Sequence, residues 1–148
     1  MNKLISPGAK SRNPDQMSTK FLKIVYAGNI VVAGTVGTLS LFAPAFASER
    51  IFHQAAGCIT STQTTGALWL GIAFLSACGL KNPLQFSPTL LLQVFYKSAF
   101  LVFSAIPAWR AGKDVPSEMA AFFVVWITAL PFAIPWRYLF SGVKPKTD

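Results

Sequence analysis

One lysine, Lys97, lies near the middle of a long apolar run, residues 82–109, that contains no other charged residue. A charged side chain at the centre of a bilayer costs about 2.5–3.5 kcal/mol on insertion scales, so such a residue usually has a partner or a function. Gln93 lies one helical turn before it, and Asn29 and Trp126 fall at similar depths in other apolar runs. We therefore predict an interior polar layer that contacts a ligand or a partner, with the Trp126 ring facing the Lys97 ammonium group. A hydrogen bond to a neighbouring helix is the alternative role of Asn29.

No acidic residue falls at the depth of Lys97, because Glu49 and Glu118 belong outside the membrane core. Three explanations for the lysine remain open. Its side chain extends toward the interface or bonds backbone carbonyls and Gln93; it meets an anionic or carbonyl-bearing ligand such as a lipid headgroup or a quinone; or it pairs with an acid of another subunit. Schiff-base or proton-relay catalysis is disfavoured, since no second titratable group is near.

A second, weaker cluster at the outer surface consists of Glu49, Arg50 and His53. A solvated rim of ion pairs, which Glu118 can join from another loop, is the favoured interpretation. One histidine cannot form a metal site of the usual kind, so no metal is predicted. The sequence contains no phosphate loop, nucleophile elbow or HExxH motif. This disfavours an enzyme but does not exclude one. No cofactor is predicted, a quinone or a lipid being the only candidates.

Composition indicates which elements position these residues. The chain has 148 residues, of which 53% are hydrophobic and 12% charged, against about 25% charged residues in soluble domains. Four apolar runs are long enough to cross a hydrocarbon core of about 30 Å, which takes about 20 helical residues. We predict an all-α polytopic membrane protein, a bundle of four transmembrane helices. The predicted parts are a disordered basic cytoplasmic tail (1–20), a transmembrane domain (21–142, with helices at about 21–43, 64–80, 87–109 and 117–138) and a cytoplasmic tail (143–148).

Small residues in the predicted helices indicate where they pack. Gly34 and Gly37 lie in the first apolar run and Gly71 in the second. Small side chains let helix backbones approach closely in lipid, where packing rather than hydrophobic burial drives association. We predict that these three glycines contribute to helix packing within the bundle or against a partner.

Lysine and arginine are distributed unequally between the two sides of the predicted bundle. The N-terminal tail, the second loop and the C-terminal tail carry nine of them, and the first and third loops carry three. By the positive-inside rule both termini are cytoplasmic, in an inner membrane of the bacterial type. The net charge of +8 then reflects topology and attraction to anionic lipid, not nucleic-acid binding. A secretory signal cleaved after Ala45-Phe46-Ala47 is the alternative, and it would leave three spans with the same orientation of the C-terminus.

Three segments carry a family resemblance: residues 66–73 (GALWLGIA), 87–97 (SPTLLLQVFYK) and 133–138 (AIPWRY). Together with the basic N-terminal tail and the layout of two helical hairpins, they resemble small DoxX-like bacterial membrane proteins, over about residues 21–140. Some DoxX-like proteins are associated with redox enzymes or quinone-linked complexes, so the resemblance implies an accessory subunit. It carries over no catalytic residue, because no catalytic motif is matched.

The sequence thus leads to three functional hypotheses. The first is a non-catalytic accessory or scaffold subunit of a membrane assembly, with the bilayer, other membrane subunits or further copies of itself as partners. The second is a binder or carrier of a small lipophilic or anionic ligand, a quinone or a lipid, at a polar site around Lys97. The third is a component of a membrane redox-linked enzyme.

Overall fold

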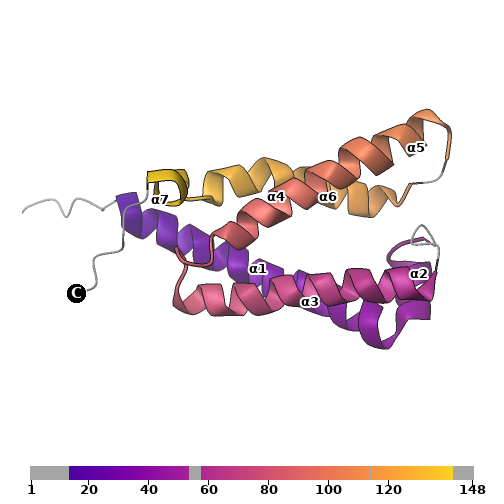
Figure 1. The fold of residues 1–148 in the computed structure, drawn as a ribbon, viewed down its shortest axis with the longest axis horizontal. Coiled ribbons are helices and arrows are strands. Elements are labelled where there is room, and N and C mark those ends of the chain that lie inside the picture. The colour runs from indigo at the N-terminus through magenta and orange to yellow at the C-terminus, as the bar shows by residue number, and fades with distance from the viewer. Residues whose placement is uncertain (1–13, 54–57, 114, 142–148) are drawn as a thin grey trace, which may run out of the picture.

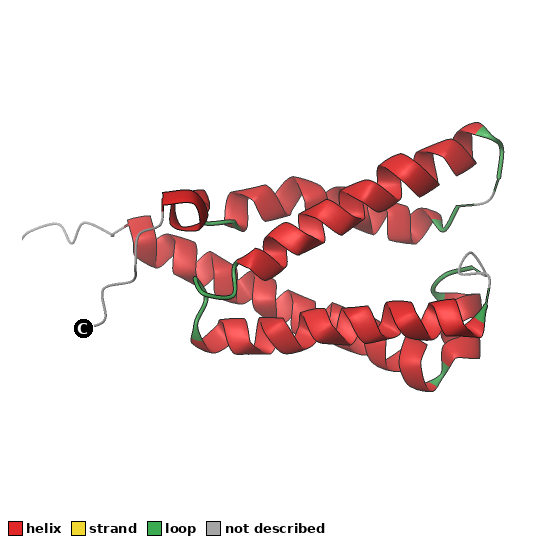
Figure 2. Ribbon diagram, in the orientation of Figure 1, coloured by secondary structure: helices red, strands yellow, loops and turns green. Residues whose placement is uncertain are grey.

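The computed structural model describes residues 14–53, 58–113 and 115–141, and every regular element within them is a helix, as predicted (Figure 2). Of the two predicted cytoplasmic tails, residues 1–13 of the first and all of the second (143–148) lie outside the described residues. The helices are α1 (Pro14–Phe42), α2 (Pro44–Arg50), α3 (Ile59–Lys81), α4 (Pro88–Phe100), the π-helical segment η1 (Leu101–Ala105), α5 (Ile106–Arg110), α6 (Ser117–Ala133) and α7 (Trp136–Ser141).

Two helical hairpins make up the molecule (Figure 1). α1 and α3 pack against each other along much of their length, and α4, η1 and α5 form one long rod that packs against α6. The start of α1, the turn between α3 and α4, and α7 lie at one end of the bundle, and α2 and the end of α5 lie at the other. The described chain therefore begins and ends on the same side.

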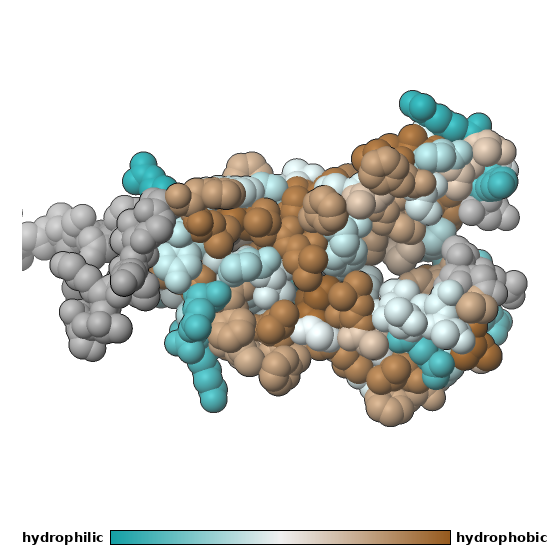
Figure 3. Space-filling model, in the orientation of Figure 1, coloured by the Kyte–Doolittle hydropathy of each residue, from teal (hydrophilic) through white to brown (hydrophobic). Residues whose placement is uncertain are grey.

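Three of the helices are long and apolar enough to cross a membrane: Thr19–Phe42, Ile59–Lys81 and Pro88–Arg110, with 24, 23 and 23 residues. Ser117–Ala133 is apolar but shorter, with 17 residues. Large hydrophobic side chains point outward, among them Phe103 and Phe132, which are 82% and 83% exposed. Figure 3 shows the same pattern, with the strongly hydrophilic residues of the visible face toward the two ends and a mostly hydrophobic middle. These features indicate a membrane protein.

Two helices begin earlier than predicted. α1 begins at Pro14 rather than near residue 21, so the end of the tail predicted to be disordered is helical; proline is favoured at the first position of a helix. α3 begins at Ile59 rather than near residue 64. The threonines there donate their hydroxyl protons to carbonyls one turn back, Thr64 to Thr60 and Thr65 to Ser61, both at 2.9 Å. A polar segment that resembles a loop is thereby accommodated in a helix.

Prolines interrupt the second hairpin. The fourth predicted helix, 117–138, is instead split into α6 and α7, because Ile134 precedes Pro135 and has extended backbone (ψ 124°). In the other rod, η1 ends at Ala105, two residues before Pro107, which has no N–H to donate to the preceding turn. The predicted start of that rod at Ser87-Pro88 agrees with α4, but the Ser87 hydroxyl donates to the Leu84 carbonyl oxygen at 2.7 Å instead of capping the helix.

Glycines set the distance between α1 and α3. A Cβ atom added at Gly37 would lie 2.9 Å from the Gly66 carbonyl oxygen and from the Leu70 backbone nitrogen, so only glycine fits. At Gly34 it would meet the Ala73 Cβ at 3.8 Å, an ordinary contact. At Gly71 nothing lies within 4 Å, so the packing role predicted for that glycine is not seen within the described chain. Two further glycines of α3 are as tightly packed: a Cβ atom at Gly66 would lie 2.7 Å from the Ser40 Cβ, and one at Gly79 would lie 2.7 Å from the Tyr26 ring.

The two predicted glycines offer a matched pair of substitutions. Gly37→Ala forces a methyl group against backbone atoms of α3, and overpacking of this kind costs about 1–3 kcal/mol. Gly71→Ala places the same methyl group in open space, so we expect thermal stability in detergent to be unchanged or slightly raised. Equal unfolding temperatures for the two variants would contradict this picture of the α1–α3 interface.

Candidate functional site

Two hydrophobic clusters lie inside the bundle, one after the other along its long axis. The first lies toward the turn between α3 and α4, and the second lies toward α2 and α5. The buried residues of the first cluster are Leu22, Val25, Tyr26, Leu90, Leu130, Ala133 and Ile134. Those of the second are Ala33, Trp69, Ile72, Ala73 and Phe123.

Buried polar residues form a layer between the two clusters. Asn29 lies in α1 between Tyr26 and Ala33, and Gln93 lies in α4 just after Leu90. Ser76 in α3 follows Ala73 of the second cluster in the same way, and Lys97 follows Gln93 by one turn. All four polar side chains are buried, with exposed fractions of 2% or less. The fold thus brings Asn29, Gln93 and Lys97 to one level of the bundle.

The Lys97 ammonium group makes its polar contacts on its own helix. Its Nζ atom donates to Gln93 Oε1 at 3.1 Å and to the Tyr96 hydroxyl oxygen at 2.5 Å. The side chain reaches Gln93 because side chains on a helix tilt toward its N-terminus. Aromatic rings cover the rest of the cation: Nζ lies 4.4 Å from the ring centroid of Tyr96, 5.2 Å from that of Phe123 and 5.8 Å from that of Trp69. A cage of three rings therefore surrounds the amine.

The Trp126 ring, which we predicted to face Lys97, lies elsewhere in the bundle. Trp126 packs against the first cluster, and its ring contacts Phe122, with centroids 5.8 Å apart. A Cβ atom at Gly28 would lie 3.7 Å from the Trp126 ring, which places that ring against α1. The cation–π partners among the described residues are Tyr96, Trp69 and Phe123 instead. Tyr96 is adjacent to Lys97 in the chain, but only the approach of α3 and α6 brings the other two rings to the amine.

The polar layer contains more hydrogen-bond donors than acceptors. Within the described residues, Asn29 Nδ2, Gln93 Nε2 and Ser76 Oγ are buried without a hydrogen-bond partner. Lys97 forms no ion pair within the described part of the chain. Buried polar groups without partners are rare, and each one calls for an explanation such as a bound molecule or water.

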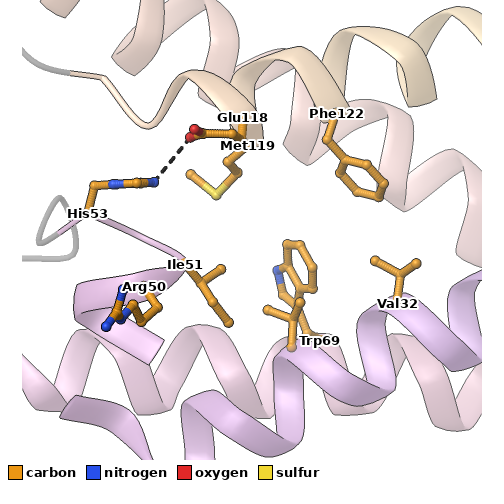
Figure 4. Close-up of a pocket in the computed structure, with 9 residues that line it drawn as sticks. Val32, Arg50, Ile51, His53, Trp69, Glu118, Met119 and Phe122 are labelled. Carbon is orange, nitrogen blue, oxygen red and sulfur yellow. Dashed lines mark ion pairs between the residues drawn. The ribbon is translucent and has the colours of Figure 1, made fainter. Parts of the chain in front are cut away.

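Two cavities lie beside the rings that surround Lys97, both between the hairpins at the α2 end. One, of about 400 Å³, is lined on one side by Val32, Arg50, Ile51 and Trp69 and on the other by Met119 and Phe122 (Figure 4). Its neighbour, of about 270 Å³, is lined by Phe52, Thr65, Leu68, Trp69, Tyr96, Phe100, Met119 and Phe123. Trp69 and Met119 belong to both linings, so the two cavities form one cleft; Figure 3 shows the surface hollowed between the hairpins at this end.

An ion pair crosses the mouth of the cleft. His53 Nε2 lies 3.1 Å from Glu118 Oε2, joining the segment after α2 to the first turn of α6 (Figure 4). Of the predicted outer rim, His53 is thus paired and Arg50 lines the larger cavity, while Glu49 is exposed and forms no ion pair within the described chain. His53 has a positive φ of 48°, a conformation that few side chains adopt without a local reason. The contact links the two hairpins where they are otherwise separated by the cleft.

Sequence reasoning missed the cleft residues Trp69, Tyr96, Met119 and Phe123. Apolar residues in membrane helices occur on lipid-facing and interior sides alike, so their types do not show which of them meet. Only the position of Tyr96 beside Lys97 gave a usable signal. The chain matches no protein-family model, no curated protein and no solved structure, so the interpretation of this site is based on its geometry.

The buried charge leads to a prediction about stability. Lys97→Met keeps an unbranched side chain and removes a cation that no carboxylate of the described chain balances. Replacing a buried charge by an apolar group of similar size is often stabilising, so we expect unfolding in detergent to require on the order of 1 kcal/mol more. Lys81→Met, at the exposed end of α3, is the control and should leave the stability unchanged. A lower stability of Lys97→Met would mean that the bonds to Gln93 and Tyr96 outweigh the cost of burial.

Proposed function

We propose that this chain is a four-span membrane protein that binds a small lipophilic molecule in the cleft between its two hairpins. The carrying observation is the pair of adjoining cavities, which share Trp69 and Met119 and lie against the rings that surround Lys97. Ligand sites are typically concave and mostly apolar, with a few polar groups that orient the ligand, and have volumes of about 300–1,000 Å³. The cleft has this character.

The cleft favours binding over a purely structural accessory role. A scaffold subunit requires tight helix contacts, such as those of α1 and α3 at Gly37 and Gly66. It does not require space between its hairpins, nor an amine enclosed by three aromatic rings. The redox-linked enzyme, the third hypothesis, has no specific geometric support among the described residues. The DoxX-like relationship suits a membrane accessory protein that carries such a ligand and is part of the proposal.

The membrane placement is also proposed. In it, α6 is the fourth span, both termini are cytoplasmic, and the cleft opens toward the outer face of a bacterial inner membrane. Two observations support this placement. The described chain begins and ends at the same end of the bundle, and among the described residues that end carries Lys20, Lys23, Lys81 and Arg137, whereas the other end carries Arg50, Arg110 and Lys113. α7 then lies at the inner interface, where the stacked Trp136 and Phe140 rings suit the headgroup region.

A native cysteine tests the orientation. Cys58 is exposed and lies just before α3, and a hydrogen bond from the Ser61 hydroxyl lowers the pKa of its thiol, which favours the reactive thiolate. We expect a membrane-impermeant maleimide to label this residue in intact spheroplasts, and Cys58→Ser to abolish the labelling. Labelling that appears only after the membrane is opened would reverse the proposed topology.

Filling the cleft tests the binding. Met119 lines both cavities, so Met119→Trp introduces a large ring into the space proposed for the ligand. We expect lipophilic molecules that co-purify with the wild-type protein, detected by native mass spectrometry, to be lost from this variant. Val125→Trp, at a position of α6 that is 65% exposed, is the matched control and should retain them.

The outcome of this comparison decides the proposal. If the wild type and both variants retain equal amounts of bound lipophilic molecules, these molecules lie outside the cleft, and the proposed ligand-binding function is wrong. An empty wild-type protein that also binds no added lipophile would do the same. The thermal stability of Met119→Trp is measured alongside, so that loss of ligand is distinguished from loss of fold.

A further inference from the structure

We propose that the cleft selects the polar end of its ligand through the Tyr96 hydroxyl, and that the ligand is a single-chain lipophile ending in a carboxylate. This inference rests on the proposed function, because it assigns the chemical class of the molecule held in the cleft. It is carried by the hydrogen bonding of Tyr96, which contacts Lys97 of the polar layer and also lines the smaller cavity.

Tyr96 is the reachable polar group of that pair. Its side chain lines the smaller cavity and is only partly buried, whereas Lys97 behind it is 2% exposed. The Tyr96 oxygen accepts a hydrogen bond from Lys97 Nζ, and no acceptor for its own O–H group is present among the described residues. A phenol has one proton to donate and lone pairs to accept with. With Lys97 donating to its oxygen, Tyr96 is left to donate into the cleft.

The positive charge of Lys97, behind Tyr96, also favours a ligand group that accepts hydrogen bonds and carries negative charge. The acids with described side chains are Glu49, which is exposed, and Glu118, which is paired with His53 at the mouth of the other cavity. Arg50 and Glu118 both line that other cavity, so their charges offset each other there, and Lys97 is left as the unbalanced charge beside the cleft. In a medium of low dielectric constant an unbalanced cation attracts an anionic group and repels a second cation. A carboxylate is therefore favoured, and an ammonium group is disfavoured.

The other polar side chain of the smaller cavity does not change this selection. The Thr65 hydroxyl donates to the Ser61 carbonyl oxygen at 2.9 Å and keeps only its lone pairs free. It can accept from an alcohol or an ammonium group but carries no charge. The remaining lining of the cavity is apolar or aromatic and accommodates a hydrocarbon chain of any headgroup. Discrimination therefore depends on Tyr96 and on the charge of Lys97.

Three probes of equal chain length test the inference: palmitate, hexadecanol and hexadecylamine, each titrated into the protein in uncharged-lipid nanodiscs. We expect palmitate to bind the wild type about tenfold more tightly than hexadecylamine, a ratio that corresponds to about 1.4 kcal/mol at 25 °C. Hexadecanol should lie between them. Tyr96→Phe keeps the ring and removes only the hydroxyl group, so the ratio of palmitate to hexadecylamine affinity should fall severalfold in this variant, and the part that remains reflects the charge of Lys97.

A second tyrosine provides the control. Tyr26 donates to the Pro83 carbonyl oxygen at 2.8 Å and belongs to the first cluster, away from the cleft. Tyr26→Phe is the same chemical change and should leave the ratio of palmitate to hexadecylamine affinity as in the wild type. A merely structural role of the Tyr96 hydroxyl would change the unfolding temperature without changing that ratio.

The results separate this inference from the proposed function. Binding of all three probes with equal affinity by the wild type, lost in Met119→Trp, would overturn the carboxylate preference and leave the cleft as a ligand site. A ratio of palmitate to hexadecylamine affinity that is unchanged in Tyr96→Phe would overturn the role of the hydroxyl. Binding of none of the probes would overturn both proposals.

Discussion

An ammonium group held in an apolar interior without a carboxylate is the constraint on which the centre of this bundle depends. Such a charge is tolerated only when other groups replace the water that it has lost. Here two oxygen atoms and three ring faces do so, from Gln93, Tyr96, Trp69 and Phe123. Because the rings come from α3, α4 and α6, solvating one cation fixes how the two hairpins meet at that level.

The two kinds of helix contact in the bundle have different consequences. α1 and α3 meet backbone to backbone at Gly37 and Gly66, which leaves no room for a ligand between them. The hairpins meet each other through bulky rings, whose shapes do not fill the space between them, so cavities remain around Trp69 and Met119. The cleft is therefore a result of joining the hairpins through aromatic side chains.

The sequence predicted the helical class, the apolar runs and the buried position of Lys97 on physical grounds that act locally. Length and composition define a membrane helix, and Gln93 and Tyr96 are close to Lys97 in the chain, so their proximity follows from helical geometry. The meeting of Trp69 with Phe123, and the cleft beside them, depends on how separate helices approach, which residue types do not encode. Two helix ends were also predicted wrongly. The threonine hydroxyls at the start of α3 donate hydrogen bonds to carbonyls of the same helix, so that a polar segment is helical, and the extended backbone before Pro135 ends α6.

The shortness of α6 bears on the lipid around the protein. Its 17 residues rise about 25 Å at 1.5 Å per residue, less than the roughly 30 Å hydrocarbon thickness of an average bilayer. The three longer helices have no such deficit, so the shortfall lies on one side of the molecule only. In the proposed placement the acyl chains next to α6 compress and the headgroups dip toward α7, which makes hydrophobic mismatch asymmetric around the protein.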